Sequence, residues 1–137
     1  MKKYFGRVSG PLLDRIDIQV EVPAVSYEEL STRPAAPESS AAIRARVNAA
    51  RAIQGRRFGV STRCNAHMTN TQLDEHCVLD DAGKKLMESA FTRLGMTARS
   101  YTRILKVART IADLEGTREI QAPHLAEALQ YRQLTME

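Results

Sequence analysis

Apolar residues recur every three or four positions through most of the chain beyond residue 40, which is the spacing of amphipathic helices. We expect a first helix over 40–57, a second over 80–94, a third over 97–115 and a fourth opened by Pro123. The stripes expected to meet in the core are Ile43, Val47, Ala50 and Ile53; Leu86, Ala90, Phe91 and Leu94; Tyr101, Ile104, Leu105, Ala108, Ile111 and Ala112; and Leu125, Ala128 and Leu129. Four helices that each bury one such face predict a small helical bundle.

Residues suited to helix ends support these boundaries. The carboxylate of Asp80 or Asp81 can accept hydrogen bonds from the first turn of the second helix, and Gly95 is placed to end that helix. Gly116 is the expected end of the third helix, because glycine adopts the left-handed conformation without a steric cost. The sequence of residues 60–79 predicts an irregular link between the first and second helices, with one short helical turn at Thr71–His76.

Near the N-terminus the pattern changes. Residues 16–22 alternate apolar and polar side chains without a break, which is typical of a half-buried strand. No other segment alternates as well, so this strand either pairs in another way or belongs to a sheet outside the chain. A connector rich in Pro and Ser follows over 31–40. We therefore predict an all-α fold, with an extended N-terminal segment (1–37) before a helical domain (38–137).

Composition excludes several classes of protein. The chain has 137 residues, no Trp and only 5% aromatic residues, which argues against a base-stacking surface for single-stranded nucleic acid. No apolar run approaches the roughly 18 residues of a membrane span. Two cysteines make no disulfide framework, so we expect a cytoplasmic protein without a membrane partner. The net charge of +4 permits an anionic partner but does not require one.

Positive charge is concentrated in one stretch. Residues 39–73 contain six arginines and no acidic residue. On the first predicted helix, Arg44, Arg46 and Arg51 could contact the phosphates of DNA. Such arginines are also common on solvated helix faces, and we expect some of this stretch to pair with acidic residues of the later helices.

Two cysteines and two histidines have the donor atoms of a zinc site, in the order Cys64, His67, His76 and Cys77. Their spacing argues against zinc, since adjacent His76 and Cys77 on a helical turn point about 100° apart. We therefore expect no metal site, and two buried, reduced cysteines that pack the link against the bundle.

The most specific short string is Gly10–Asp17, with the sequence GPLLDRID. It places Arg15 after a Gly-Pro turn and between two aspartates. A rigidly held guanidinium can stabilise the charge that develops in phosphoryl transfer. From the residues alone, a surface ion pair is the stronger interpretation, since an arginine between two aspartates is usually one.

A second arginine occupies an unfavourable position. Arg99 falls in the first turn of the third predicted helix, where the helix dipole disfavours a cation. It is compatible either with contact to an anion or with an ordinary solvated side chain. Arg103, one turn further along, is a second candidate for an anion contact.

Several separated strings share one resemblance. In chain order they are GPLLDRIDIQVEVP, CNAHM, TARSYTRILKVARTIADLEG and HLAEALQYR, within a match that runs from Tyr4 to Arg132. Together they resemble the C-terminal part of magnesium-chelatase-like AAA+ ATPases, in the ComM/YifB-like branch. Members of this family are ring-forming ATPases with a nucleotide-binding core followed by a helical lid.

The resemblance implies roles for particular residues. Arg15 matches the arginine finger, which acts in trans on the ATP of a neighbouring subunit, and Arg99 matches the sensor-2 arginine. Residues 16–22 match the last strand of the core sheet. The resemblance also implies ATP and Mg²⁺ as cofactors of the full-length parent, and a homo-oligomeric ring, expected to be a hexamer.

The chain departs from the family in lacking the residues that hold ATP and Mg²⁺, including a run of four apolar residues that ends in paired acids. It has no Gly-x-x-x-x-Gly-Lys-Ser/Thr loop to hold the phosphates of ATP. We therefore expect a fragment that neither holds ATP and Mg²⁺ nor hydrolyses ATP by itself. The expected function is that of a lid that moves about the 34–37 connector in a motor for DNA branch migration related to competence. The alternative is a separate helical DNA-binding module that uses the first helix. The shared lid does not distinguish DNA from a metal-chelatase protein as substrate of the parent.

Overall fold

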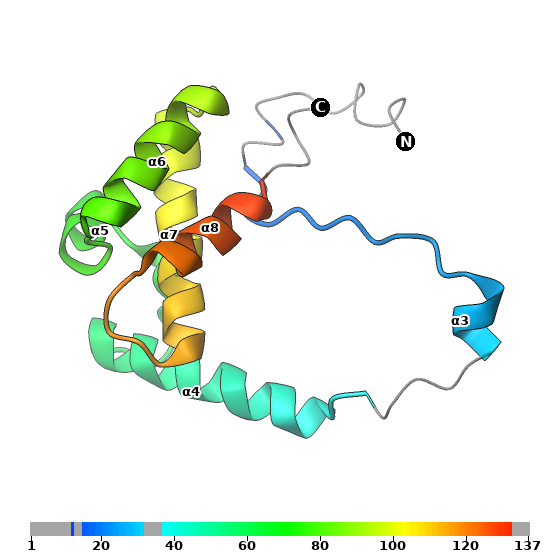
Figure 1. Cartoon of the computed structure of the whole chain (residues 1–137). Coiled ribbons are helices and arrows are strands. Elements are labelled where there is room, and N and C mark those ends of the chain that lie inside the picture. The colour runs from blue at the N-terminus through cyan, green and yellow to red at the C-terminus, as the bar shows by residue number, and fades with distance from the viewer. Residues whose placement is uncertain (1–11, 13–14, 32–36, 133–137) are drawn as a thin grey trace.

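The computed structural model describes residues 12, 15–31 and 37–132, and Figure 1 draws them in colour. The helices in these ranges are α3 (Tyr27–Ser31), α4 (Ser40–Phe58), the 3₁₀ turn η1 (Asn65–His67), α5 (Asn70–His76), α6 (Asp81–Arg93), α7 (Ala98–Glu115) and α8 (Ala122–Gln130). The described part of the chain contains no β-strand, so the predicted all-α fold is confirmed. Most of the connector proposed as a hinge, and the Gly-Pro turn before Arg15, lie outside the described residues.

Helix α7 is the centre of the bundle. It packs against α8, α4, η1 and α5, while α6 packs against α8 (Figure 1). Its apolar residues recur at helical spacing, and Ile104, Ala108 and Ala112 are almost fully buried. From α8, Leu125 and Ala128 fill the opposite side of the same core. The hydrophobic stripes predicted for these two helices therefore form the core.

The helix ends follow the capping residues. The Asp80 side chain accepts a hydrogen bond of 2.7 Å from the backbone N–H of Gly83, and α6 begins at the next residue. Thr97 caps α7 in the same way. Gly95 and Gly116 follow the ends of α6 and α7 with φ angles of 53° and 77°, in the left-handed region. These boundaries confirm the predictions made from the sequence.

Two predicted apolar stripes are only partly buried. Ile43 and Val47 of α4 are 43% and 45% exposed, because the N-terminal half of α4 extends beyond the bundle and no helix covers it (Figure 1). On α6, Phe91 is also exposed, and Met87 is buried in its place. The buried face of α6 is set by its contact with α8, which turns Phe91 towards solvent. Tyr101 of α7 lies at the edge of the core and is 36% exposed.

The strand predicted over 16–22 does not form within the described part of the chain. Those residues run along the bundle without a strand partner, and Ile18 and Val20 are both exposed. A single backbone hydrogen bond of 2.9 Å joins the N–H of Gln19 to the carbonyl of Tyr131. The short helix α3 was not predicted, since it falls between the alternating segment and the Pro-rich connector.

Candidate functional site

The two arginines singled out by the sequence lie near the same end of α7. Arg99 is in the first turn of α7, and its side chain is exposed. Arg103, one turn along, donates a hydrogen bond of 2.8 Å from Nη1 to the backbone carbonyl of Arg15. The same guanidinium forms an ion pair with the carboxylate of Asp17. A contact between residues 88 positions apart thus joins the backbone of Arg15 to the guanidinium of Arg103, whose backbone lies one helical turn from that of Arg99.

Arg103 and Arg99 differ in what they contact. The guanidinium of Arg103 is occupied by Asp17 and by the carbonyl of Arg15, so it fixes the N-terminal segment on α7. Arg132, at the end of the described chain, adds a hydrogen bond of 3.3 Å to the carbonyl of Ile16. The side chains of Arg15 and Arg99 are exposed and form no ion pair with a described residue. Of the two arginines at the start of α7, only Arg99 is therefore available to an anion.

A cavity of about 810 Å³ opens beside these residues. The N-terminal segment forms one wall through Asp17 and Ile18, and α7 forms the other through Arg99 and Arg103. Tyr131 closes the end near α8, where its hydroxyl donates a hydrogen bond of 2.9 Å to Glu127. That hydrogen bond raises the pKa of the Tyr131 hydroxyl, so the tyrosine remains neutral at physiological pH. The lining thus combines the free guanidinium of Arg99 with paired charged groups such as Arg103 and Asp17 and with apolar side chains.

A buried polar network lies further along α7, and sequence reasoning did not predict it. The carboxylate of Asp113 is fully buried and receives two hydrogen bonds from Arg57 of α4. It also accepts a hydrogen bond of 3.1 Å from Arg109 and one of 2.8 Å from Asn65. Arg109 continues the network to the backbone carbonyls of residues 117 and 118, in the loop before α8. This network ties α4, η1, α7 and the α7–α8 loop together.

The pKa values in the network reflect burial and pairing. Burial by itself would raise the pKa of Asp113. The pKa is nevertheless lowered, because the hydrogen bonds from Arg57 and Asn65, together with the charges of Arg57 and Arg109, outweigh the effect of burial. The Asp113 carboxylate therefore stays ionised at pH values below the usual pKa of an aspartate. Burial lowers the pKa of Arg109, and Asp113 opposes that effect. The expectation that an arginine of the basic stretch pairs with an acid of a later helix is confirmed for Arg57 and Asp113.

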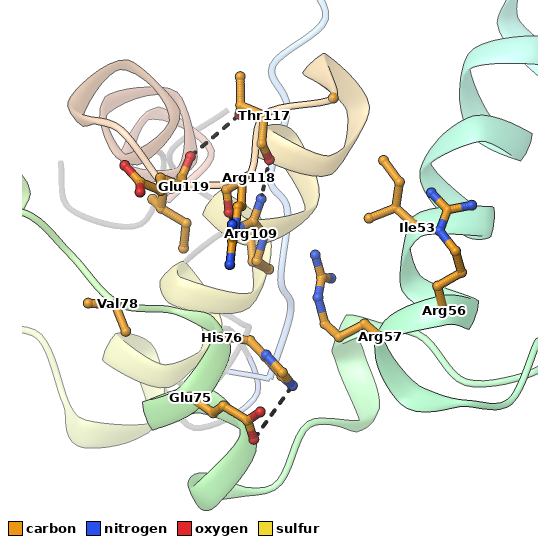
Figure 2. A pocket seen from close by; sticks show the side chains of 12 residues that line it. Ile53, Arg56, Arg57, Glu75, His76, Val78, Arg109, Thr117, Arg118 and Glu119 are labelled. Carbon is orange, nitrogen blue, oxygen red and sulfur yellow. Dashed lines mark hydrogen bonds and ion pairs between the residues drawn. The ribbon is translucent and has the colours of Figure 1, made fainter.

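A second cavity, of about 690 Å³, lies over this network. Figure 2 shows arginines from α4, from α7 and from the α7–α8 loop around it, with Glu75 and His76 at the end of α5. The guanidinium of Arg57 points from α4 towards Arg109. The sequence signal that could have located this cavity is the spacing of Arg109 and Asp113, four residues apart on one helix face.

Comparison with known proteins identifies the family. A model of the C-terminal region of magnesium chelatase subunit ChlI matches residues 37–132, and a second model of the same subunit matches residues 1–30. This chain belongs to the magnesium chelatase ChlI C-terminal family. The first match covers the whole helical bundle, and the second covers the segment that carries Arg15.

The relatives of this ChlI C-terminal chain include the competence protein ComM of Haemophilus influenzae, with 43% identity over 130 residues. The uncharacterized protein YifB is 39% identical in Salmonella typhimurium and 38% identical in Escherichia coli, again over 130 residues. Each alignment covers 95% of this chain and 25% of the relative. The chain therefore spans about a quarter of the length of these curated relatives.

The arginines proposed for DNA contact do not form one row on this ChlI C-terminal domain. Arg44 and Arg51 are seven residues apart and lie on nearly the same side of α4. Arg46 lies on the other side, where it forms a bidentate ion pair with Glu38 at 2.6 and 3.0 Å. Arg51 makes only a hydrogen bond of 3.5 Å to Gln54. Of the three, Arg44 and Arg51 are the ones available to a phosphate backbone.

The cysteines and histidines considered for zinc lie in separate surroundings. Cys64 Sγ is 3.3 Å from His67 Nδ1, whereas Cys77 is buried with its Sγ 3.8 Å from the sulfur of Met68. The ring of His76 packs edge-on against Phe58 instead. Within the described residues, no three His, Cys, Asp or Glu side chains gather as a metal site would require.

The prediction of two buried cysteines is correct for only one of them. Burial raises the pKa of the Cys77 thiol to about 11, so this thiol is protonated at neutral pH. Cys64 is only half-buried, because it precedes η1 at the surface of the bundle.

Among the helices that the structure describes, none carries an apolar stretch of the length needed to cross a bilayer.

Proposed function

We propose that this chain is the helical lid, with an adjoining segment of the core, of a ring-forming ATPase. In this proposal residues 1–37 belong to the core and residues 38–137 form the lid. The separate family matches to residues 1–30 and 37–132 support that division. The parent forms a homo-oligomeric ring, which we propose to be a hexamer, and uses ATP and Mg²⁺.

The observation that carries this proposal is the contact of Arg103 with the backbone of Arg15. It places two exposed arginines, Arg15 and Arg99, at the same end of α7 while Arg103 itself is neutralised by Asp17. We propose that the guanidinium of Arg15 binds phosphate oxygens of the ATP held by the neighbouring subunit, and that Arg99 binds phosphate oxygens of the ATP held by the same or the neighbouring subunit. Arg15 acts as the arginine finger and Arg99 as the sensor-2 arginine.

The chemistry of a guanidinium suits these roles. Its planar fork donates two parallel hydrogen bonds to phosphate oxygens and stays charged at any physiological pH. In phosphoryl transfer, negative charge is spread over the oxygens of the transferring and leaving groups, and Arg15 would stabilise that charge by its position. Arg99 orients the phosphates from the lid. The described residues offer no cluster of carboxylates for Mg²⁺, so we assign none of them to the metal.

The test is ATP hydrolysis by the complete gene product that contains this chain. We expect R15A to lower kcat by about 10³-fold or more, as loss of an arginine finger does, and R99A to lower kcat/KM. The matched control is R93A, since Arg93 is also an exposed arginine, at the C-terminal end of α6 six residues before Arg99, but does not line the cavity beside Arg99. Wild-type turnover in both R15A and R99A, or a complete gene product without ATPase activity, would refute the proposal.

We propose DNA as the substrate of the motor, which would act in branch migration. Two observations support DNA: a relative is named a competence protein, and α4 carries the exposed Arg44 and the half-buried Arg51 on nearly the same side. The same face supports the second candidate, a DNA-binding module independent of ATP. If α4 binds duplex DNA, R44Q/R51Q should reduce the slope of log K against log salt by about two, because two phosphate contacts are lost. A slope unchanged from wild type excludes α4 as the DNA contact, and R93Q again serves as control.

A further inference from the structure

The cavity over the buried network differs from the Arg99 site in position and in composition. It lies between the C-terminal half of α4, the end of α5 and the α7–α8 loop (Figure 2). The two cavities share no lining residue, and along the axis of α7, which rises about 1.5 Å per residue, Arg99 lies about 15 Å from Arg109 and about 25 Å from Gly116. A ligand in this cavity is therefore distinct from the nucleotide of the proposed ATP site. The arginines that line the cavity are Arg56, Arg57, Arg109 and Arg118.

The floor of the cavity carries an excess positive charge. The side chains of Arg57 and Arg109 are only 12% and 3% exposed, and both pair with the single carboxylate of Asp113. Two buried cations thus share one anion. The lowered pKa of Arg109 has the same origin, since its burial is only partly offset by Asp113. Arg57 uses its two terminal nitrogens for Asp113 and Asn65, and its guanidinium points towards the centre of the cavity (Figure 2).

The rim adds two further cations. Arg56 on α4 and Arg118 on the α7–α8 loop are exposed, and neither forms an ion pair with a described residue. Glu75 and Glu119 are the acidic residues of the lining, and Glu75 lies 3.8 Å from Nε2 of His76. With Asp113 included, four arginines face three carboxylates. The site keeps a net charge of +1 with His76 neutral.

We infer that this cavity binds a phosphate group, held by the free guanidiniums of Arg56 and Arg118 over the excess positive charge of Arg57 and Arg109. A phosphate offers acceptor oxygens in several directions, so it can receive guanidinium forks from two walls at once, whereas a carboxylate has two oxygens in one plane. The volume of about 690 Å³ exceeds what a bare ion fills and lies in the range of small-molecule sites. The side chains of Ile53 and Val78 supply apolar wall for the organic part of a phosphorylated ligand.

The phosphate could belong to a free phosphorylated molecule or to a nucleic-acid backbone, and two probes separate these sources. The 137-residue chain is titrated with inorganic phosphate, and separately with a short DNA duplex, at an ionic strength held constant with chloride. Binding is followed by calorimetry and by the chemical shifts of the arginine side-chain N–H groups. The cavity variants are R56Q and R118Q, whose exposed side chains hold no other element in place.

We expect saturable binding of inorganic phosphate to the wild-type chain. The Kd should rise about tenfold in R56Q and in R118Q, because each variant loses one charge-assisted hydrogen bond. The control is R93Q, an exposed arginine on α6 outside the cavity, which should bind both probes as wild type does. Duplex binding that both cavity variants weaken, without binding of inorganic phosphate, supports the site and assigns it to nucleic acid. No saturable binding of either probe, or binding that survives both cavity variants, overturns the inference. ATPase activity plays no part in this test, so its outcome is independent of the proposed function.

Discussion

Asp113 offers the most direct test of how this bundle is held together. Its carboxylate is fully buried and is the common partner of Arg57 and Arg109, whose side chains are themselves nearly buried. The substitution D113N keeps the shape of the side chain but removes its charge. An amide nitrogen would then face guanidinium donors, and two buried cations would have no counter-charge.

The expected loss is large compared with the stability of a small domain. Removing one partner of a buried ion pair costs about 3–5 kcal/mol, mostly because the remaining charge stays buried and unpaired. Domains of this kind are stable by about 5–15 kcal/mol, so D113N should remove at least about a fifth of the free energy of unfolding. With a urea m-value of about 2 kcal/mol/M, the unfolding midpoint should fall by about 2 M.

The assay is urea unfolding of the 137-residue chain at neutral pH, followed by far-UV circular dichroism. D74N is the control, because Asp74 is an exposed acid on α5 and its loss should change the free energy of unfolding by less than about 0.5 kcal/mol. The double variant R57Q/D113N should cost less than the sum of the two single changes, since both act on one pair. A D113N protein within about 1 kcal/mol of wild type would refute the role given to the network.

Three further outcomes follow from the same structure. The pKa of Asp113 is lower in the folded chain than in the unfolded chain. Its contribution to the free energy of unfolding is therefore complete above the unfolded pKa of about 4 and is lost as the pH falls through the folded pKa. Acid titration should narrow the difference in the free energy of unfolding between wild type and D113N. G116A should lower the free energy of unfolding by about 1 kcal/mol, because Gly116 has a left-handed φ of 77°. G55A should raise it by about 0.5–1 kcal/mol, because Gly55 lies inside α4 and a new Cβ there would make only ordinary contacts. Equal urea midpoints for the two variants would contradict this. At pH 8 a thiol reagent should label Cys64 rapidly and Cys77 only after unfolding, since the pKa of Cys77 is about 11; rapid labelling of both would show that Cys77 is not buried.

The helices and their ends could be predicted because their causes are local. Asp80, Thr97 and Gly116 determine helix ends through contacts within a few residues, and the stripe on α7 depends only on helical periodicity. The strings around Arg15 and Arg99 likewise indicated the family that the comparisons identify. The exposure of Ile43 and the turn of Phe91 towards solvent were not predictable from periodicity, since both depend on which helix lies opposite.

The sequence by itself thus determined the helical architecture, the helix ends and the membership of a family. Only the tertiary structure decided that Arg57 meets Asp113 across 56 residues, and that Arg103 binds the backbone of Arg15 across 88. Those contacts decide which arginines are neutralised and which stay free, because a charge is neutralised by whatever carboxylate lies within a few ångströms of it. Spacing along the chain does not contain that information for residues so far apart. The two cavities, and the free arginines at Arg99 and Arg118, follow from those long-range contacts.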